Sequence, residues 1–351
     1  MKLFVINTPC WMDLSAQGLN NQKLFVNPFS DHFTFLYMNF MKYGLADEVH
    51  VFVEDKRWVE SGDFSQRKVE TEYGNIFLHK EDKKSEIINS YKEGFLYCWS
   101  KWKDCAEFSD KFILVNPMFN GLQYENEIDP SVHNYALIEG SAYVKYLPKN
   151  MPYDVLRYIS HDCIPKNKKI EKKYDWIMVS SFDPRKRHLE FLKSLYGTTL
   201  QKTKGCIIGR DPDNKGRIWA GHRVLREIEK NKSLFNYDVH INATQQEKND
   251  LLKQSKIFVC VSTLDNGPRA QIEAAQLKLP ILSMPHIGSS DIILSGKNGE
   301  IINDVSFAPP MLDKMLTNIE SYNCEVNDDI LNPDNFMPKI VNNILKKYEN
   351  N

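Results

Sequence analysis

Residues 256–273 read KIFVCVSTLDNGPRAQIE and decide the fold, because they combine a strand, a turn and the start of a helix. The run 256–261 is apolar nearly throughout, which is typical of a strand in a parallel sheet that is covered on both faces. The Asn-Gly pair at 266–267 predicts a turn. Pro268 suits the first position of a helix, where its missing amide hydrogen would have no partner, and helix formers continue to Leu277. The stretch therefore predicts a parallel α/β sheet.

Two carboxylates, Asp265 and Glu273, stand eight residues apart on either side of this predicted helix start. Free backbone amides at a helix N-terminus favour anions. Helical side chains lean back toward the N-terminus, so the Glu273 carboxylate could reach a ribose beside a phosphate bound there. Asp265 would face the same place from the strand side. The pattern predicts a site for a nucleoside diphosphate that carries a sugar.

Length and composition predict a globular protein of two domains. At 351 residues the chain exceeds the usual size of a single core, and the space between two domains is a common binding site. The 42% hydrophobic and 26% charged residues argue against disorder outside the termini. The 45 Lys and Arg residues nearly cancel the 46 Asp and Glu residues, so no overall charge favours nucleic acid or an acidic membrane.

The cysteines and the N-terminus predict a reduced, cytoplasmic protein. The seven cysteines are scattered and odd in number, without a Cys-x-x-Cys spacing for zinc or redox chemistry. No set of histidines and carboxylates indicates a metal, and we expect no cofactor. The N-terminal apolar run is too short for a signal peptide, and no segment approaches the roughly 18 apolar residues of a membrane span. Any membrane contact would be peripheral.

Alternating strands and helices predict two Rossmann-like halves. In the first half we expect a helix at 31–43 and strands at 2–6, 48–54, 111–115, 135–139 and 155–159. In the second half we expect strands at 175–179, 205–208, 239–242, 256–261 and 281–283, with helices at 188–196, 221–230, 246–255 and 269–277. The basic segment 165–173 is typical of a linker. The predicted domains are therefore 1–164 and 174–334, with a final helix in 335–351 that returns to the first domain.

The order of elements from about 155 to 305 resembles the GT-B glycosyltransferases, in particular the retaining family 4. Their fold consists of two Rossmann-like domains with a cleft between them. Two glutamates with seven residues between them mark the family's donor site, and Asp265 and Glu273 keep this spacing. The resemblance implies that Glu273 binds the ribose hydroxyls, while Asp265 faces the transferred sugar and the diphosphate. It also implies donor contacts from Asn266, Gly267, Pro268, Arg269 and Ala270.

The stretch VSSFDPRKRH at 179–188 resembles the family's strand and loop in which an arginine, and a lysine five residues later, neutralise the diphosphate. Lys186 occupies the position of the lysine, but Ser181 stands in place of the arginine. We therefore expect the second positive charge to come from another arginine nearby. The candidates for this charge are Arg185, Arg187 and Arg269.

The stretch CIIGR at 206–210 resembles the next family strand, whose end lies near the nucleotide base; here that end is Gly209 and Arg210. The first half resembles the family less, with NPMFN at 116–120 where many relatives carry a histidine, so the acceptor site is unassigned. Trp11 is the best candidate to stack on an acceptor. His161 and His188 are more typical of hinge or capping residues than of catalysts.

The resemblance implies a retaining, metal-independent transferase that moves a sugar from a nucleotide-sugar donor to a hydroxyl of a glycan or glycoconjugate. Asp265 and Lys186 are the catalytic candidates. Lys186, a neighbouring arginine and the helix amides near Gly267 would stabilise the charge that grows on the leaving diphosphate. In such relatives the leaving phosphate is thought to help deprotonate the acceptor on the same face, which explains why the sequence shows no obvious protein base.

Three alternatives stay open. The acceptor could be a hydroxymethylated DNA base, as for phage glucosyltransferases of the same architecture, and binding that depends steeply on salt would favour this hypothesis. A hydrolysing nucleotide-sugar epimerase would turn over its donor without an acceptor. A degenerate nucleotide-sugar-binding scaffold, suggested by Ser181, Asp265 and the missing histidine, would bind the donor without turnover.

Overall fold

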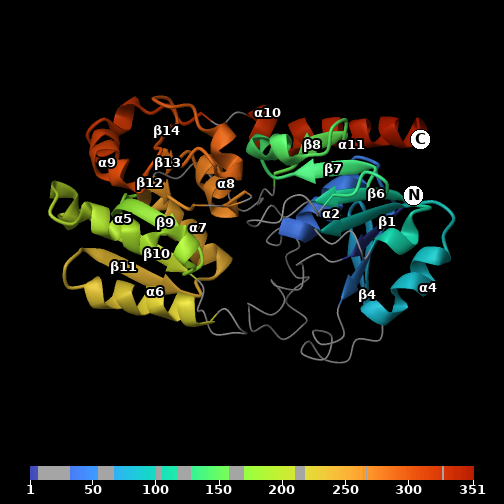
Figure 1. Cartoon of the computed structure of the whole chain (residues 1–351), viewed down its shortest axis with the longest axis horizontal. Coiled ribbons are helices and arrows are strands. Elements are labelled where there is room, and N and C mark those ends of the chain that lie inside the picture. The colour runs from blue at the N-terminus through green and yellow to red at the C-terminus, as the bar shows by residue number, and fades with distance from the viewer. Residues whose placement is uncertain are drawn as a thin grey trace. The chain divides into compact units, whose positions relative to one another are not determined.

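The computed structural model describes residues 1–6, 32–53, 67–99, 105–116, 128–157, 170–209, 218–263, 265, 267–325 and 328–351. It divides into two compact units, each with its own largely parallel sheet (Figure 1). The first unit comprises residues 1–139, 143–161 and 328–351, and the second comprises 140–142 and 162–327. This α/β architecture of two Rossmann-like sheets confirms the predicted fold class.

The second unit holds a six-stranded sheet in the order β11-β10-β9-β12-β13-β14, in which every neighbouring pair is parallel. All five residues of β10 are buried, as a strand with both faces covered requires. The strands are β9 (Tyr174–Val179), β10 (Gly205–Gly209), β11 (Tyr237–Ile241), β12 (Ser255–Cys260), β13 (Ile281–Ser283) and β14 (Gly299–Ile301).

In the described part of this unit, the α-helices that cover the sheet are α5 (His188–Leu195), α6 (Ile218–Asn231), α7 (Gln245–Lys253), α8 (Arg269–Gln276) and α9 (Ala308–Thr317). The chain runs outward from β9 to β11 and then returns to β12 on the other side of β9. Right-handed crossovers therefore put α5 and α6 on one face and α7 and α8 on the other. Because the strand order reverses between β9 and β12, their carboxyl ends form the switch point at which such sheets bind ligands.

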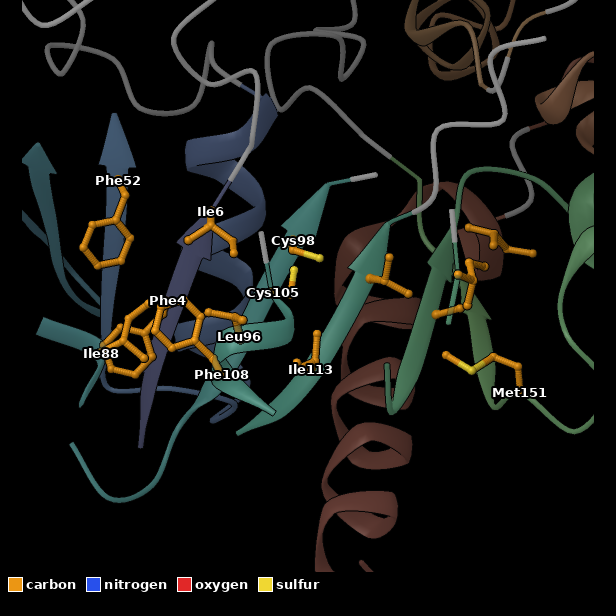
Figure 2. Close-up of a cluster of buried hydrophobic side chains, with 14 of the residues drawn as sticks. Phe4, Ile6, Phe52, Ile88, Leu96, Cys98, Cys105, Phe108, Ile113 and Met151 are labelled. Carbon is orange, nitrogen blue, oxygen red and sulfur yellow. The ribbon is translucent and has the colours of Figure 1, made fainter. Parts of the chain in front are cut away.

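The first unit holds an eight-stranded sheet in the order β3-β4-β2-β1-β5-β6-β7-β8. Among the strand pairs of the described residues, only β3–β4 is antiparallel. The strands are β1 (Lys2–Ile6), β2 (Glu48–Val53), β3 (Arg67–Thr71), β4 (Gly74–Lys80), β5 (Phe95–Trp99), β6 (Phe112–Asn116), β7 (Tyr135–Ile138) and β8 (Tyr153–Val155). The helices are α2 (His32–Lys42), α4 (Lys84–Asn89), α10 (Asp328–Leu331) and α11 (Pro333–Glu349). Figure 2 shows one hydrophobic cluster of this unit, to which Phe4, Leu96 and Ile113 contribute from the three central strands.

The C-terminal helix α11 packs on the first unit. Asp334 accepts hydrogen bonds from Lys42 at 2.7 Å and from Tyr43 at 2.5 Å at the end of α2. The rings of Tyr348 and Phe95 lie 5.1 Å apart, between their centroids. The buried residues of α11 recur at helical spacing, so an apolar stripe holds it on the unit.

One strand prediction is wrong. The strand expected at 155–159 is β8, which ends at Val155 because its partner β7 ends at Ile138, opposite that residue. The predictions for Trp11 and His161 lie outside the described residues. In the part of the chain that is described, no helix has the length and apolar character needed to cross a bilayer.

Candidate functional site

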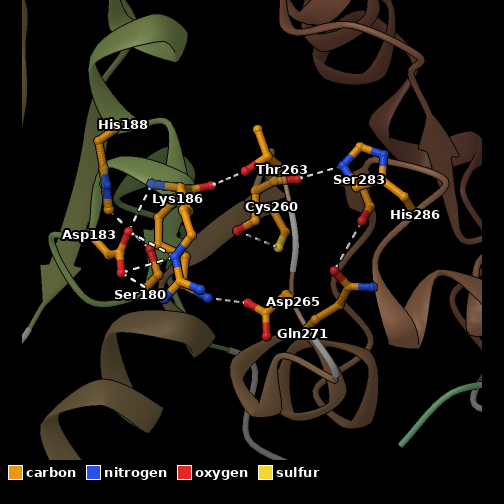
Figure 3. A network of polar contacts seen from close by, with 12 residues as sticks. Ser180, Asp183, Lys186, His188, Cys260, Thr263, Asp265, Gln271, Ser283 and His286 are labelled. Carbon is orange, nitrogen blue, oxygen red and sulfur yellow. Dashed lines mark hydrogen bonds and ion pairs between the residues drawn. The ribbon is translucent and has the colours of Figure 1, made fainter. Parts of the chain in front are cut away.

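The predicted site residues gather at the carboxyl ends of β9 and β12, where the strand order reverses. The amide of Thr263, after β12, donates to the carbonyl of Arg185, after β9, at 2.8 Å. The amide of Gly288, after β13, donates to the carbonyl of Asp265 at 2.9 Å. Backbone hydrogen bonds therefore tie together the loops that follow β9, β12 and β13, and Figure 3 shows the bond between Thr263 and the loop after β9.

The loop after β9 presents Lys186 from a single turn of 3-10 helix, Pro184–Lys186. The Asp183 side chain caps this turn by accepting from the Arg185 amide at 2.9 Å. Arg187 ends the turn with φ 58°, in the left-handed region, and α5 begins at the next residue. A capped turn of this kind fixes where the Lys186 side chain leaves the backbone.

Lys186 and Asp265, the two catalytic candidates, form an ion pair (Figure 3). Each side chain is 16% exposed, so the pair is largely shielded but still reaches solvent. The two residues come from loops 79 positions apart in sequence. The structure thus brings together a cation and a carboxylate that the sequence analysis had selected separately.

The arginines beside Lys186 are also paired with carboxylates. The Arg185 guanidinium donates three hydrogen bonds of 2.8 to 3.2 Å to the Asp183 carboxylate and thereby lowers the pKa of that carboxyl. Arg187 lies 3.9 Å from an oxygen of Asp304, a longer contact. Ser181, which stands in place of the expected arginine, is exposed. All three described cations of this loop therefore have an acidic partner in the protein.

The N-terminus of α8 lies next to Asp265 in sequence. The helix begins at Arg269, as the predicted range 269–277 has it, and Pro268 is its N-cap rather than its first helical residue. The reason is its ψ of 109°, which is not helical, while its carbonyl accepts the first bond, from the Gln271 amide at 2.8 Å. The amides of Arg269 and Ala270 therefore precede the first intrahelical hydrogen bond. Gly267 is half-buried, and Asn266 lies outside the described residues.

A buried glutamine fixes α8 against the sheet. Gln271 is fully buried, its Nε2 donates to the Ser289 carbonyl at 3.1 Å, and its Oε1 accepts from the Ser283 hydroxyl at 3.1 Å. Figure 3 shows this link between α8 and the end of β13. The direction of α8, and hence of its first amides, is therefore set by packing and hydrogen bonds in the core.

Glu273 is fully buried, in contrast to an ordinary surface glutamate of a helix. The Lys248 ammonium of α7 lies 2.6 Å from one carboxylate oxygen and 2.7 Å from the other. Gln245 donates to Glu273 at 3.1 Å. The sequence analysis missed Lys248 and Gln245. Their spacing of three residues indicates a shared helix face, but nothing in the sequence shows that this face meets Glu273.

Among the remaining predicted residues, Gly209 ends β10, the strand beside β9, and His188 begins α5. Gly209 is buried at the end of β10, where a Cβ atom would lie 2.5 Å from the Phe182 ring, so this packing requires glycine. Arg210 is outside the described residues. His188 is buried against the Ser180 hydroxyl at 3.1 Å, and burial, aided by the charge of Lys186, lowers the pKa of His188 to about 4. His188 is therefore neutral at pH 7 and adds no charge to the site.

One group among the described residues has the composition of a metal site: Cys98, Cys105 and His133, all buried in the first unit. The Asp129 amide donates to Nδ1 of His133 at 3.0 Å. That nitrogen is therefore the acceptor, and Nε2 carries the hydrogen of the neutral ring. Nε2 lies 4.0 Å from the Cys98 sulfur and directs an N–H, rather than a lone pair, into the group. This tautomer disfavours a metal ligand at Nε2.

Comparison with known proteins gives a family match over part of the chain and a fold for nearly all of it. Residues 161–311 match the family of glycosyl transferases group 1. No curated protein sequence matches the chain. Three solved structures are similar over nearly their whole length. Sucrose-phosphate synthase from Thermosynechococcus elongatus is 7% identical with a TM-score of 0.67, and the match covers 99% of this chain and 98% of that one.

The other two structures have a TM-score of 0.64, and each match covers 100% of this chain and 99% of the other. They are a glycosyltransferase from Rickettsia africae, 11% identical, and HepE from Anabaena in complex with UDP-glucose, 9% identical. These findings confirm the predicted resemblance to group 1 glycosyltransferases and the GT-B fold. The narrower assignment to family 4 stays a prediction.

Proposed function

We propose that this chain is a retaining, metal-independent glycosyltransferase that moves a sugar from a nucleoside diphosphate to a hydroxyl of a glycan or glycoconjugate. The observation that carries the proposal is the contact of Lys186 with Asp265 at the switch point of the second sheet, beside the N-terminus of α8. The family match spans both residues. A cation, a carboxylate and the amides at a helix N-terminus are what a diphosphate and its sugar require.

In the proposed complex, the diphosphate takes Lys186 from Asp265 and accepts hydrogen bonds from the first amides of α8. Glu273 accepts hydrogen bonds from the ribose hydroxyls, and Asp265 faces the sugar. The bond between the anomeric carbon and the phosphate oxygen breaks, and its electron pair stays on the diphosphate, where Lys186 and the helix N-terminus stabilise the charge. The acceptor oxygen bonds to the same face of the sugar, and its proton goes to the leaving phosphate.

The scaffold hypothesis is the second candidate, because one observation favours it. The three cations of the β9 loop already have acidic partners within the protein: Lys186 with Asp265, Arg185 with Asp183 and Arg187 with Asp304. A loop with this charge balance is stable without a diphosphate. The scaffold would bind a nucleotide sugar without cleaving the bond between sugar and diphosphate, so a turnover assay distinguishes the two functions.

The test is a thermal shift against UDP-, GDP-, ADP- and CDP-sugars, since a ligand that binds only the folded state stabilises it by about 2.7 kcal/mol at a hundred times its Kd. HepE was solved with UDP-glucose, so UDP-glucose is the first donor to try. We expect one donor class to raise the Tm by several degrees and Glu273→Gln to abolish the rise. The control is Glu190→Gln, an exposed carboxylate of α5.

Activity is then measured as nucleotide release with and without an acceptor panel, in the presence of a chelator. An α-linked product from an α-linked donor, unaffected by the chelator, would agree with the retaining and metal-independent reaction. Donor binding without nucleotide release, whichever acceptor is added, would support the scaffold hypothesis. No shift with any donor would contradict both functions.

A further inference from the structure

A buried ion pair joins α7 to α8 at the residue we assign to the ribose. The Lys248 ammonium contacts both oxygens of Glu273, at 2.6 and 2.7 Å. The Glu273 side chain is 0% exposed and that of Lys248 is 15% exposed. A carboxylate at this depth stays ionised only when it is paired and hydrogen-bonded. Lys248 is therefore the group that allows a charged Glu273 in this position.

The same ammonium orients a third side chain. The Gln245 amide oxygen accepts from Lys248 at 2.9 Å, and its nitrogen donates to Glu273 at 3.1 Å. The three side chains form a closed ring of hydrogen bonds. A capping box between Thr244 and Glu247 fixes the first turn of α7, from which Gln245 and Lys248 extend on one face. The Glu273 carboxylate cannot rotate without breaking its bonds to α7.

We propose that Lys248 is a positioning residue for the donor: it holds Glu273 charged and oriented toward the ribose, so that the preference for a ribose over a 2′-deoxyribose nucleotide depends on Lys248. This inference rests on the proposed function. The Glu273 side chain has no exposed surface in the free protein, so the atoms that cover it must move aside when a ribose binds. A carboxylate offers about four lone-pair directions, so Glu273 can then accept from α7 and from the ribose hydroxyls together. A site built to hydrogen-bond a substrate hydroxyl rejects an analogue that lacks it, because the buried acceptor is left unsatisfied.

The experiment compares the affinities of UDP and 2′-deoxy-UDP, and of GDP and 2′-deoxy-GDP, by calorimetry. We expect the wild type to prefer the ribose form by about tenfold or more, since losing a hydrogen bond to a charged group is worth about 1.5–3 kcal/mol. Lys248→Met should weaken the ribose form and leave the deoxy form, which brings the ratio close to one. Lys253→Met is the matched control on the same helix, because its ammonium faces Asp250 at 4.0 Å, and it should keep the ratio.

An unchanged ratio in Lys248→Met would overturn the inference, and so would an equal loss for both nucleotides, which indicates a purely structural role. If the single variant does not fold, Lys248→Met combined with Glu273→Gln removes both charges at nearly constant volume. The double variant should bind both forms equally, and a retained ribose preference would refute the role of Lys248. A wild type without any nucleotide affinity would instead contradict the proposed function. A wild type that binds both forms equally overturns the ribose contact, while turnover still tests the transferase.

Discussion

Replacing Asp265 by asparagine should strengthen the binding of UDP while it slows sugar transfer. In the free protein the Lys186 ammonium is held by the Asp265 carboxylate. A diphosphate that uses Lys186 must first take it from this partner, and it also meets the negative charge of Asp265. Asparagine is nearly the same size as aspartate but has no charge. The substitution therefore removes both the competition for Lys186 and the repulsion of the diphosphate.

The size of the gain follows from the exposure of the pair. Two unit charges 4 Å apart attract by about 4 kcal/mol at an effective dielectric constant near 20, before desolvation is subtracted. Exposed pairs contribute only about 0.2–1 kcal/mol, whereas breaking a buried pair costs about 3–5 kcal/mol. With 16% of each side chain exposed, the Lys186–Asp265 pair lies between these limits. We expect about 1–2 kcal/mol, which is about 5- to 30-fold in Kd.

The assay is calorimetric titration of UDP into wild type and Asp265→Asn, with turnover measured on the same samples. Asp175→Asn is the control: Asp175 pairs with Lys256 at 2.7 Å near the amino end of β9, away from the carboxyl ends that carry the site. The control removes the same charge from the same unit and should leave both properties unchanged. Equal or weaker UDP binding by Asp265→Asn would refute the reasoning, because Asp265 would then not compete with the diphosphate for Lys186.

Three further predictions follow from the same region. Lys186→Ala should lower kcat by about 10²-fold or more, as the loss of one group that stabilises a developing charge does, with little change in Tm; an unchanged kcat in steady-state assays would exclude Lys186 from the chemistry. Burial lowers the pKa of His188 to about 4, so the unfolded chain binds a proton that the folded protein does not. Stability should therefore fall by up to about 1.4 kcal/mol per pH unit as the pH drops from 6.5 toward 4. Urea melts should show a smaller fall for His188→Gln, and an identical fall would contradict the assignment. Arg187→Gln should weaken UDP binding more than Arg185→Gln, and the reverse order by calorimetry would contradict a role of Arg187 as the second positive charge.

The second unit was largely predictable because its apolar runs and helix caps agree with each other. The strand at 281–283 was predicted to the residue, and α7 begins at Gln245, one residue before the prediction. Helix α9 was missed because it opens with Ala308-Pro309-Pro310, which resembles a turn. Prolines are tolerated in the first turn, where backbone amides have no helical partner.

The first unit was less predictable, because two of its strands carry weak sequence signals. Strand β3, RKVET, has almost no apolar pattern, because it pairs only with β4 and forms the edge of the sheet. Its register comes from a turn in which Gly74 has a φ of 151°. Strand β5, FLYCW, is apolar but short, and such a run does not distinguish a strand from a buried helix segment. A partner distant in sequence, β1, completes the setting of β5, whereas β3 depends on its hairpin partner β4.

The same limit applies to the candidate site. Spacing along the chain selected Asp265, Glu273 and Lys186, because a strand, a turn and a helix start are local features. The contact between Lys186 and Asp265 follows from parallel neighbours whose carboxyl ends meet, which a correct strand order could have predicted. Lys248 could not be found in this way, since its role depends on how α7 packs against α8.

The arginine that is absent at Ser181 raises the question of which residue supplies the second positive charge, and the structure ranks two candidates. The Arg185 guanidinium holds the Asp183 carboxylate through three contacts of 2.8 to 3.2 Å. A phosphate that displaces Asp183 must replace these contacts with equally good ones. Arg187 reaches Asp304 only at 3.9 Å, and that carboxylate is 52% exposed, so solvent already weakens the pair. Separating Arg187 from Asp304 therefore costs the diphosphate less free energy than separating Arg185 from Asp183. We therefore infer that Arg187, which directly follows Lys186, replaces the missing arginine, while Arg185 keeps the loop in shape.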